Sequence, residues 1–173
     1  SKKFPNQVYY ISSDMDDKII DLDIKNFFIG SGFLMQYFFM TLKTENLFLT
    51  LTDLGNHSIK KTKNIKNYIY FFHAPISTTR GYTDSAFDNY DIILCNGDYQ
   101  INEIKKREII KKYKKKELIK TGYFYFDYLK EKINYQKKVD EILIAPSWNY
   151  NQENFMNKNL EIIIEQVLKK GFK

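Results

Sequence analysis

One of the two histidines in the chain ends an apolar run, in a position where it could move protons. The segment YIYFFHAPISTTRGY covers residues 68 to 82, and His73 directly follows five aromatic or β-branched residues. A run of this composition is typical of a strand. Because histidine exchanges a proton near neutral pH, His73 is a candidate for proton transfer. A histidine that ends a strand and hydrogen-bonds a loop is the structural alternative.

The residues after His73 are small, hydroxyl-bearing or turn-forming. Pro75 prevents the immediate growth of a helix. Hydrogen-bond donors follow within a few residues, supplied by Ser77, Thr78, Thr79 and Arg80. In an open parallel sheet, ligands bind outside the carboxyl ends of the strands. The segment therefore indicates a binding edge next to His73.

Glycines follow three further strand-like runs, where exposed backbone N–H groups could bind a phosphate. They stand in three turns: Gly30, Ser31 and Gly32 in IGSGF, Gly97 after DIILC and Asn96, and Thr121 with Gly122 after ELIK. The third glycine of the dinucleotide motif and the lysine of a P-loop are absent from IGSGF. Tight turns with close helix packing are the alternative. Three such turns at one edge of a sheet would outline a cleft.

The other residues with chemical potential favour structural interpretations. His57 stands in the polar, basic stretch LGNHSIKK, which predicts an exposed rather than a catalytic side chain. Cys95 is the single cysteine, so the chain has no internal disulfide, as is usual in a reducing compartment. Its place within a strand-like run predicts an inert, buried thiol. No zinc-type spacing is present, and we predict no metal site.

The elements that must position these residues alternate along the chain. Short apolar runs predict strands over residues 8–11, 26–29, 47–51, 68–72, 91–95, 117–121 and 141–145. Helical patterns cover residues 31–43, 99–113, 127–138 and 160–168, and residues 55–67 read as loop. Alternation of strand and helix after residue 90 favours βαβ units. We therefore expect an α/β fold with a mainly parallel sheet.

Composition is that of a globular protein with a real core. Of the 173 residues, 43% are hydrophobic and 17% aromatic, which argues against disorder. The longest apolar stretch, residues 32–42, is too short to span a bilayer, so it predicts either a buried helix or one lying on a membrane surface. A domain boundary is expected near residues 134–138.

Lysine and arginine are concentrated in one predicted helix. The formal net charge is +6, and eight of the twelve residues from Lys105 to Lys116 are basic. Such a run can attract nucleic acid or an anionic membrane. No nucleic-acid-binding motif accompanies it, and we predict no nucleic-acid partner. Two interpretations remain, a solvated helix face and a membrane-docking patch.

Several segments together resemble the CDP-glycerol glycerophosphotransferase family, which includes the teichoic-acid and capsule polyol-phosphate transferases of bacteria. The segments are, in order, VYYISSDMDD, FFIGSGF, LTLTDLGNHSIKK, YIYFFHAPIST, AFDNYDIILCNGDYQINEI, TGYFYFD and ILIAPSWN. They extend over nearly the whole chain. The chain differs from the usual family pattern at Ala74, Phe124, Tyr125 and Ser147, where the family commonly has Gly, Pro, Arg and Thr.

The resemblance implies a GT-B architecture of two Rossmann-like domains. Residues 1–138 would form the amino-terminal, acceptor-side domain, and residues 139–173 would begin a nucleotide-binding domain. His73 would be the general base that deprotonates an acceptor hydroxyl, with the glycine turns, Ser77, Thr78 and Asp127 as substrate-binding residues. No cofactor is expected, and we expect this segment to be inactive by itself.

The resemblance also implies the partners. The donor would be CDP-glycerol or a similar nucleotide, and the acceptor a polymer or lipid-linked precursor at the cytoplasmic face of the cell membrane. Lys105 to Lys116 could contact the anionic membrane surface there. The alternatives are a GT-B glycosyltransferase that uses a nucleotide sugar, and a non-catalytic basic module that binds membranes.

Overall fold

The computed structural model describes residues 7–20, 24–55, 59–133, 140–145 and 155–172. The chain divides into two compact units, Ser1–Asp127 and Tyr128–Lys173. The domain boundary expected within residues 134–138 lies outside the described residues, so it stays a prediction.

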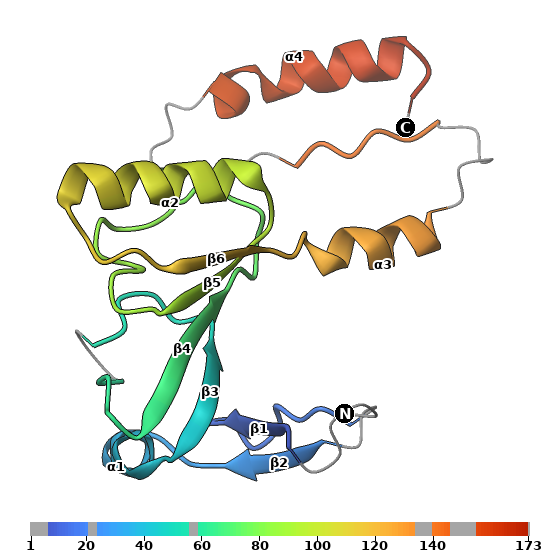
Figure 1. The fold of residues 1–173 in the computed structure, drawn as a ribbon. Coiled ribbons are helices and arrows are strands. Elements are labelled where there is room, and N and C mark those ends of the chain that lie inside the picture. Colours follow the sequence, from blue (N-terminus) through green and yellow to red (C-terminus); the bar gives the residue numbers. More distant parts are fainter. Residues whose placement is uncertain (1–6, 21–23, 56–58, 134–139, 146–154, 173) are drawn as a thin grey trace. The chain divides into compact units, whose positions relative to one another are not determined.

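A four-stranded parallel sheet forms the centre of the first unit. Its strands lie side by side in chain order, as Figure 1 shows: β3 (Thr44–Leu49), β4 (Ile65–Phe71), β5 (Ile92–Cys95) and β6 (Glu117–Lys120). Parallel neighbours require a crossover connection, and the helix α2 (Asp98–Lys111) provides the one between β5 and β6. The expected α/β, Rossmann-like fold with a parallel sheet and flanking helices is confirmed.

A smaller parallel pair precedes the main sheet. It consists of β1 (Tyr9–Ser12) and β2 (Lys25–Phe28), and the helix α1 (Phe33–Thr41) connects it to β3. The Asn64 side-chain amide donates to the Met40 carbonyl at 3.5 Å, and the Thr44 N–H donates to the Asn64 carbonyl at 3.3 Å. The end of α1 therefore lies where β3 and β4 begin. Phe39 is the buried residue of this helix, whereas Phe33 is 78% exposed.

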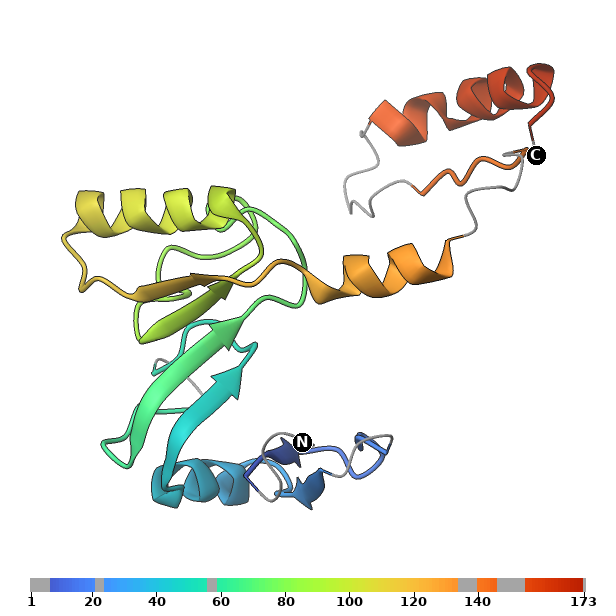
Figure 2. The same ribbon diagram turned by 45° about the vertical axis from the view of Figure 1, so that its right-hand side comes forward.

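Most of the core lies on one face of the main sheet. Alternating strand residues point to the same face, and those on this face are buried: Leu47, Tyr68, Tyr70, Ile93 and Cys95, with Phe72 just after β4. On the other face, Ile65 and Ile69 of β4 are buried as well. Phe87 and Tyr90 pack against them from the connection between β4 and β5, and Ile104 does so from α2. Figure 2 shows α2 running alongside β5 and β6. Aromatic side chains from this connection thus cover a part of the sheet that a helix would cover in many α/β proteins.

The second unit holds the end of α3 (Phe124–Lys132), which begins in the first unit, and α4 (Phe155–Lys169). α4 confirms the helix expected over 160–168. The strand expected over 141–145 is wrong, because these residues form neither helix nor strand, and Leu143 is 89% exposed. A strand needs a neighbour for its backbone groups, and no described strand pairs with this run.

The described helices are also short in comparison with a bilayer. Within the ranges given above, none combines the length and the hydropathy that crossing a membrane requires.

Candidate functional site

Three strands of the main sheet end at one edge. Register pairs Phe71 with Leu94 and Cys95 with Lys120, so β4, β5 and β6 stop at similar heights. We call the residues that follow them, 72–78, 96–98 and 121–123, the carboxyl edge. Six of the predicted site residues lie within these segments: His73, Ser77, Thr78, Gly97, Thr121 and Gly122. This is the edge at which open α/β sheets bind ligands.

The main chain around His73 is hydrogen-bonded to the segments that follow β5 and β6. The Tyr123 hydroxyl donates to the His73 carbonyl at 2.8 Å, and the Asn96 side-chain amide donates to the Ala74 carbonyl at 3.2 Å. His73 itself is exposed. These hydrogen bonds hold the main chain at His73 and Ala74, while His73 itself is open to solvent.

A buried glutamine of α2 connects the segments that follow β4 and β5. The Gln100 side chain is fully buried, donates to the Ile76 carbonyl at 2.9 Å and accepts the Asn96 N–H at 2.7 Å. The sequence reasoning missed Gln100. The sequence did hold a signal for it, because Gln100 stands four positions before the apolar Ile104 and so lies on the same face of the predicted helix.

Glu103 of α2 binds the predicted Ser77 and Thr78. Its carboxylate accepts the Ser77 hydroxyl at 2.9 Å, and the Thr78 hydroxyl and N–H both at 2.6 Å. Partial burial raises the pKa of the Glu103 carboxyl, but the hydrogen bonds from Thr78 and Ser77 lower it by more, so it lies below the ordinary value. Thr78 is also buried. Both hydroxyls thus position the segment after β4, and their role in substrate binding stays a prediction.

The other two turns at the edge differ in backbone conformation. Gly97 precedes α2 with an extended backbone, and Asp98 in the first turn pairs with Lys120 at 2.5 Å. Gly122 has a φ of +75°, which side-chain-bearing residues rarely adopt. The Thr121 hydroxyl donates to the Cys95 carbonyl at 3.3 Å and holds this turn against β5.

The third predicted turn lies elsewhere. Gly30, Ser31 and Gly32 follow β2, which belongs to the other sheet, and they lead into α1. Since α1 ends where β3 and β4 begin, the structure does not bring this turn to the carboxyl edge. Asp127 is exposed in the first turn of α3, and His57 lies outside the described residues.

The predicted inert cysteine is confirmed as buried. Cys95 has no exposed surface, and burial raises its pKa to about 11. A thiol in this environment is a poor nucleophile, because the reactive form is the thiolate.

We compared the chain with family models, curated proteins and solved structures. No family model, curated protein or solved structure matches the chain. The resemblance to the CDP-glycerol glycerophosphotransferases therefore has only the sequence segments quoted above as its basis.

Proposed function

We propose that this chain carries the acceptor-side domain of a polyol-phosphate transferase and that His73 is its general base. The observation that supports this most directly is the place of His73, exposed at the carboxyl edge of a parallel sheet, with its carbonyl held by Tyr123. The order of the quoted motifs supplies the reaction class.

In this reaction the imidazole of His73 removes the proton of an acceptor hydroxyl. The hydroxyl oxygen forms a bond to the phosphorus that carries glycerol in a CDP-glycerol-type donor, and the phosphoanhydride bond to that phosphorus breaks. CMP leaves with the electron pair of the broken bond. The products are a new phosphodiester, CMP and the protonated histidine, which returns its proton to solvent.

The proposed setting follows from the same resemblance. The acceptor is a polymer or lipid-linked precursor at the cytoplasmic face of the membrane, and the basic run from Lys105 to Lys116 contacts that surface. Transfer of a sugar from a nucleotide sugar is the competing reaction, and the choice of donor in the assay separates the two.

The test uses the full-length gene product with CDP-glycerol, CDP-ribitol and several nucleotide sugars in parallel. We expect CMP release from a CDP-polyol, and a fall in kcat of at least about 100-fold in His73→Asn, the smaller end of general-base effects. Donor affinity should stay unchanged. His57→Asn is the matched control and should retain the activity.

Near-normal turnover by His73→Asn would refute the base role. Turnover with a nucleotide sugar alone would replace the donor class and make the protein a glycosyltransferase.

A further inference from the structure

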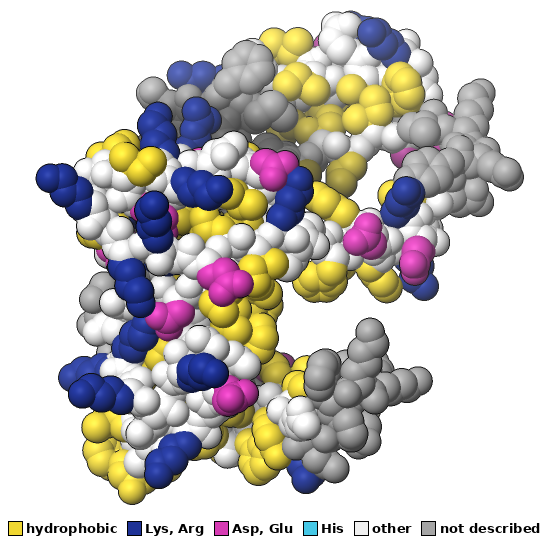
Figure 3. Space-filling view, viewed as in Figure 1, with side chains coloured by type: hydrophobic (Ala, Val, Ile, Leu, Met, Phe, Trp, Pro, Cys, Tyr) yellow, Lys and Arg dark blue, Asp and Glu magenta, His cyan; other side chains and the backbone are white. Residues whose placement is uncertain are grey.

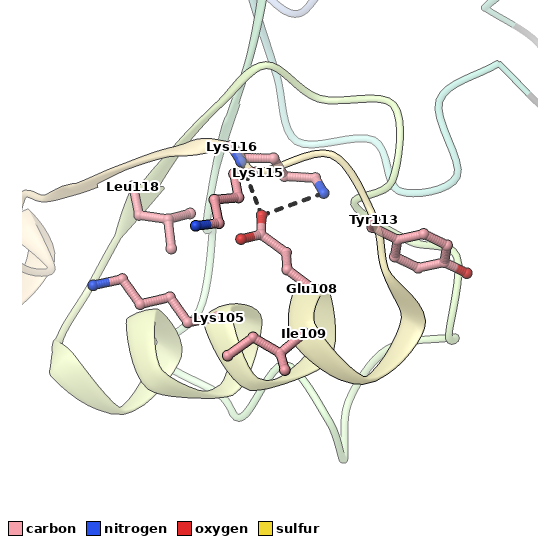
Figure 4. Close-up of a pocket in the computed structure, with 7 residues that line it drawn as sticks. All are labelled: Lys105, Glu108, Ile109, Tyr113, Lys115, Lys116 and Leu118. Carbon is pink, nitrogen blue, oxygen red and sulfur yellow. Dashed lines mark hydrogen bonds and ion pairs between the residues drawn. The ribbon is translucent and has the colours of Figure 1, made fainter.

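A pocket of about 310 Å³ opens at the other end of α2, away from the carboxyl edge. The last turns of the helix and the segment that leads into β6 line it, with Lys105, Glu108, Ile109, Tyr113, Lys115, Lys116 and Leu118 (Figure 4). Its volume is at the lower end of the range of small-molecule sites. None of these residues belongs to the carboxyl edge, although most of them lie in the basic run that the proposed function places at the membrane surface.

A buried ion pair forms the floor of this pocket. The Glu108 carboxylate accepts the Lys116 N–H at 2.9 Å and lies 3.7 Å from the Lys116 ammonium, and the two side chains are only 7% and 5% exposed. Figure 4 shows both contacts. Charges this deeply buried need their partner, so Lys116 is held in one place by Glu108.

Lys105 and Lys115 contribute cations that this pair does not neutralise. In the described part of the chain, no carboxylate lies within ion-pair distance of either ammonium. Three ammonium groups and one carboxylate leave two positive charges on the pocket walls. The partial negative charge at the end of α2 offsets about half a charge of these. On the face seen in Figure 3, further basic side chains gather around α2.

We propose that this pocket binds a phosphate monoester. Such a group carries a charge of about −1.5 to −2 near neutral pH and offers three acceptor oxygens, which matches the unneutralised charge and its donors. Ile109 and Leu118 provide an apolar wall for the body attached to the phosphate. The ligand is either a soluble phosphate ester or the headgroup of a lipid with a terminal phosphate.

The pocket is separate from His73. The 14 residues of α2 span about 21 Å at 1.5 Å per residue, with the carboxyl edge at the first residue and the pocket at the last turns. Binding here is therefore an additional property of the chain, independent of the proposed transfer.

The test follows the amide signals of the full ¹⁵N-labelled chain while inorganic phosphate replaces chloride at constant ionic strength. We expect saturable shifts at Lys115 and Lys116. Lys105→Ala/Lys115→Ala should weaken binding at least fivefold. Both side chains are exposed, so this variant should keep the thermal midpoint of the wild type.

The matched control is Lys106→Ala/Lys112→Ala, which removes the same charge from exposed residues outside the pocket lining. It should change the affinity less than twofold. An equal loss in both variants would mean diffuse attraction to a basic surface and would overturn the proposal.

A second arm uses sedimentation with vesicles of phosphatidylcholine containing one fifth phosphatidic acid, and with pure phosphatidylcholine. Pocket-dependent binding to the phosphatidic acid vesicles assigns the ligand to a lipid headgroup. Pocket-dependent binding of free phosphate without vesicle binding assigns it to a soluble ester. If neither binds, the proposal is wrong.

Discussion

Tyr123 illustrates how one hydroxyl can help to position the proposed general base. Its O–H donates to the main-chain carbonyl of His73, fifty residues away in the sequence. Phenylalanine would preserve the ring packing against Phe126 but not this bond. Tyr123 therefore acts through His73 and is a positioning residue in the proposed reaction.

Tyr123→Phe tests this role. We expect kcat to fall about three- to tenfold with little change in KM, and the free energy of unfolding to fall by about 1 kcal/mol, the net value of one hydrogen bond. Steady-state kinetics and urea unfolding measure the two effects. Tyr37→Phe, on the exposed surface of α1, is the control and should change neither. A rise in KM with kcat unchanged would show that the bond serves binding instead.

Cys95 reports on the opening of the sheet. Since it has no exposed surface and its pKa is raised to about 11, little thiolate forms at pH 8 and reagents cannot reach it. We expect Ellman's reagent to label Cys95 in the native chain at least 100-fold more slowly than in the chain unfolded by about 6 M guanidinium chloride. Rapid labelling of the native chain would contradict the described burial.

At the scale of elements, α2 organises both edges of the sheet. Gln100 and Glu103 in its first turns hold the segments after β4 and β5, and Glu108 near its end holds the segment before β6. Polar residues in the buried or half-buried stripe of the helix thus satisfy backbone groups that the loops leave without partners. The same helix therefore contributes residues to the candidate site at its first turns and to the pocket near its end.

Glu103→Gln should weaken this arrangement. The amide replaces one acceptor oxygen by a donor that faces the Thr78 or Ser77 donors, so we expect a loss of about 1.5 kcal/mol of unfolding free energy at pH 7. Urea unfolding measures this loss of unfolding free energy. Glu45→Gln, at a side chain that is 81% exposed, is the control.

The same variant gives a pH dependence with a definite sign. The pKa of Glu103 is lower in the folded state than in the unfolded chain, so its contribution is complete above about pH 4.3, the ordinary value. The contribution is lost as the pH falls through the folded-state pKa. The difference between wild type and Glu103→Gln should therefore shrink in acid. A difference that stays constant would contradict the carboxylate's role.

At the scale of the whole molecule, a cluster of aromatic side chains covers part of the main sheet where a helix could otherwise pack. The Tyr70 ring lies 4.9 Å from those of Phe72 and Phe87 and 5.1 Å from that of Tyr90, all edge to face. Phe87 and Tyr90 come from a connection in which the structure has neither helix nor strand. The abundant aromatic residues are thus what allows an irregular segment to complete the core.

Phe87→Ala should be among the most damaging substitutions. Deletion of a buried phenylalanine costs about 3–5 kcal/mol, a large part of the 5–15 kcal/mol typical of a domain. Phe48→Ala, at a 56% exposed position of β3, should cost less than about 1 kcal/mol. Urea unfolding compares the two. Similar losses would mean that the core does not depend on this loop.

Local pattern was sufficient for most of the fold and for part of the candidate site. Periodicity and residue type predicted the strands β3 to β6, the helix α2 and the burial of Cys95. They could do so because the pattern of apolar residues among near neighbours in the sequence indicates which side chains face the core. The place of His73 at a strand end follows from the same signal. The run over 141–145 shows the limit, since an apolar segment becomes a strand only when another strand pairs with it.

The sequence by itself determined which residues prefer strands, helices or turns, and hence that His73, Gly97 and Gly122 stand at strand ends. Only the tertiary structure decided that those three share an edge while Gly30 and Gly32 do not, and that Thr78 turns its hydroxyl to Glu103. The physical reason is distance along the chain. Contacts between residues 25 or 50 positions apart depend on strand order and register, which no local periodicity encodes.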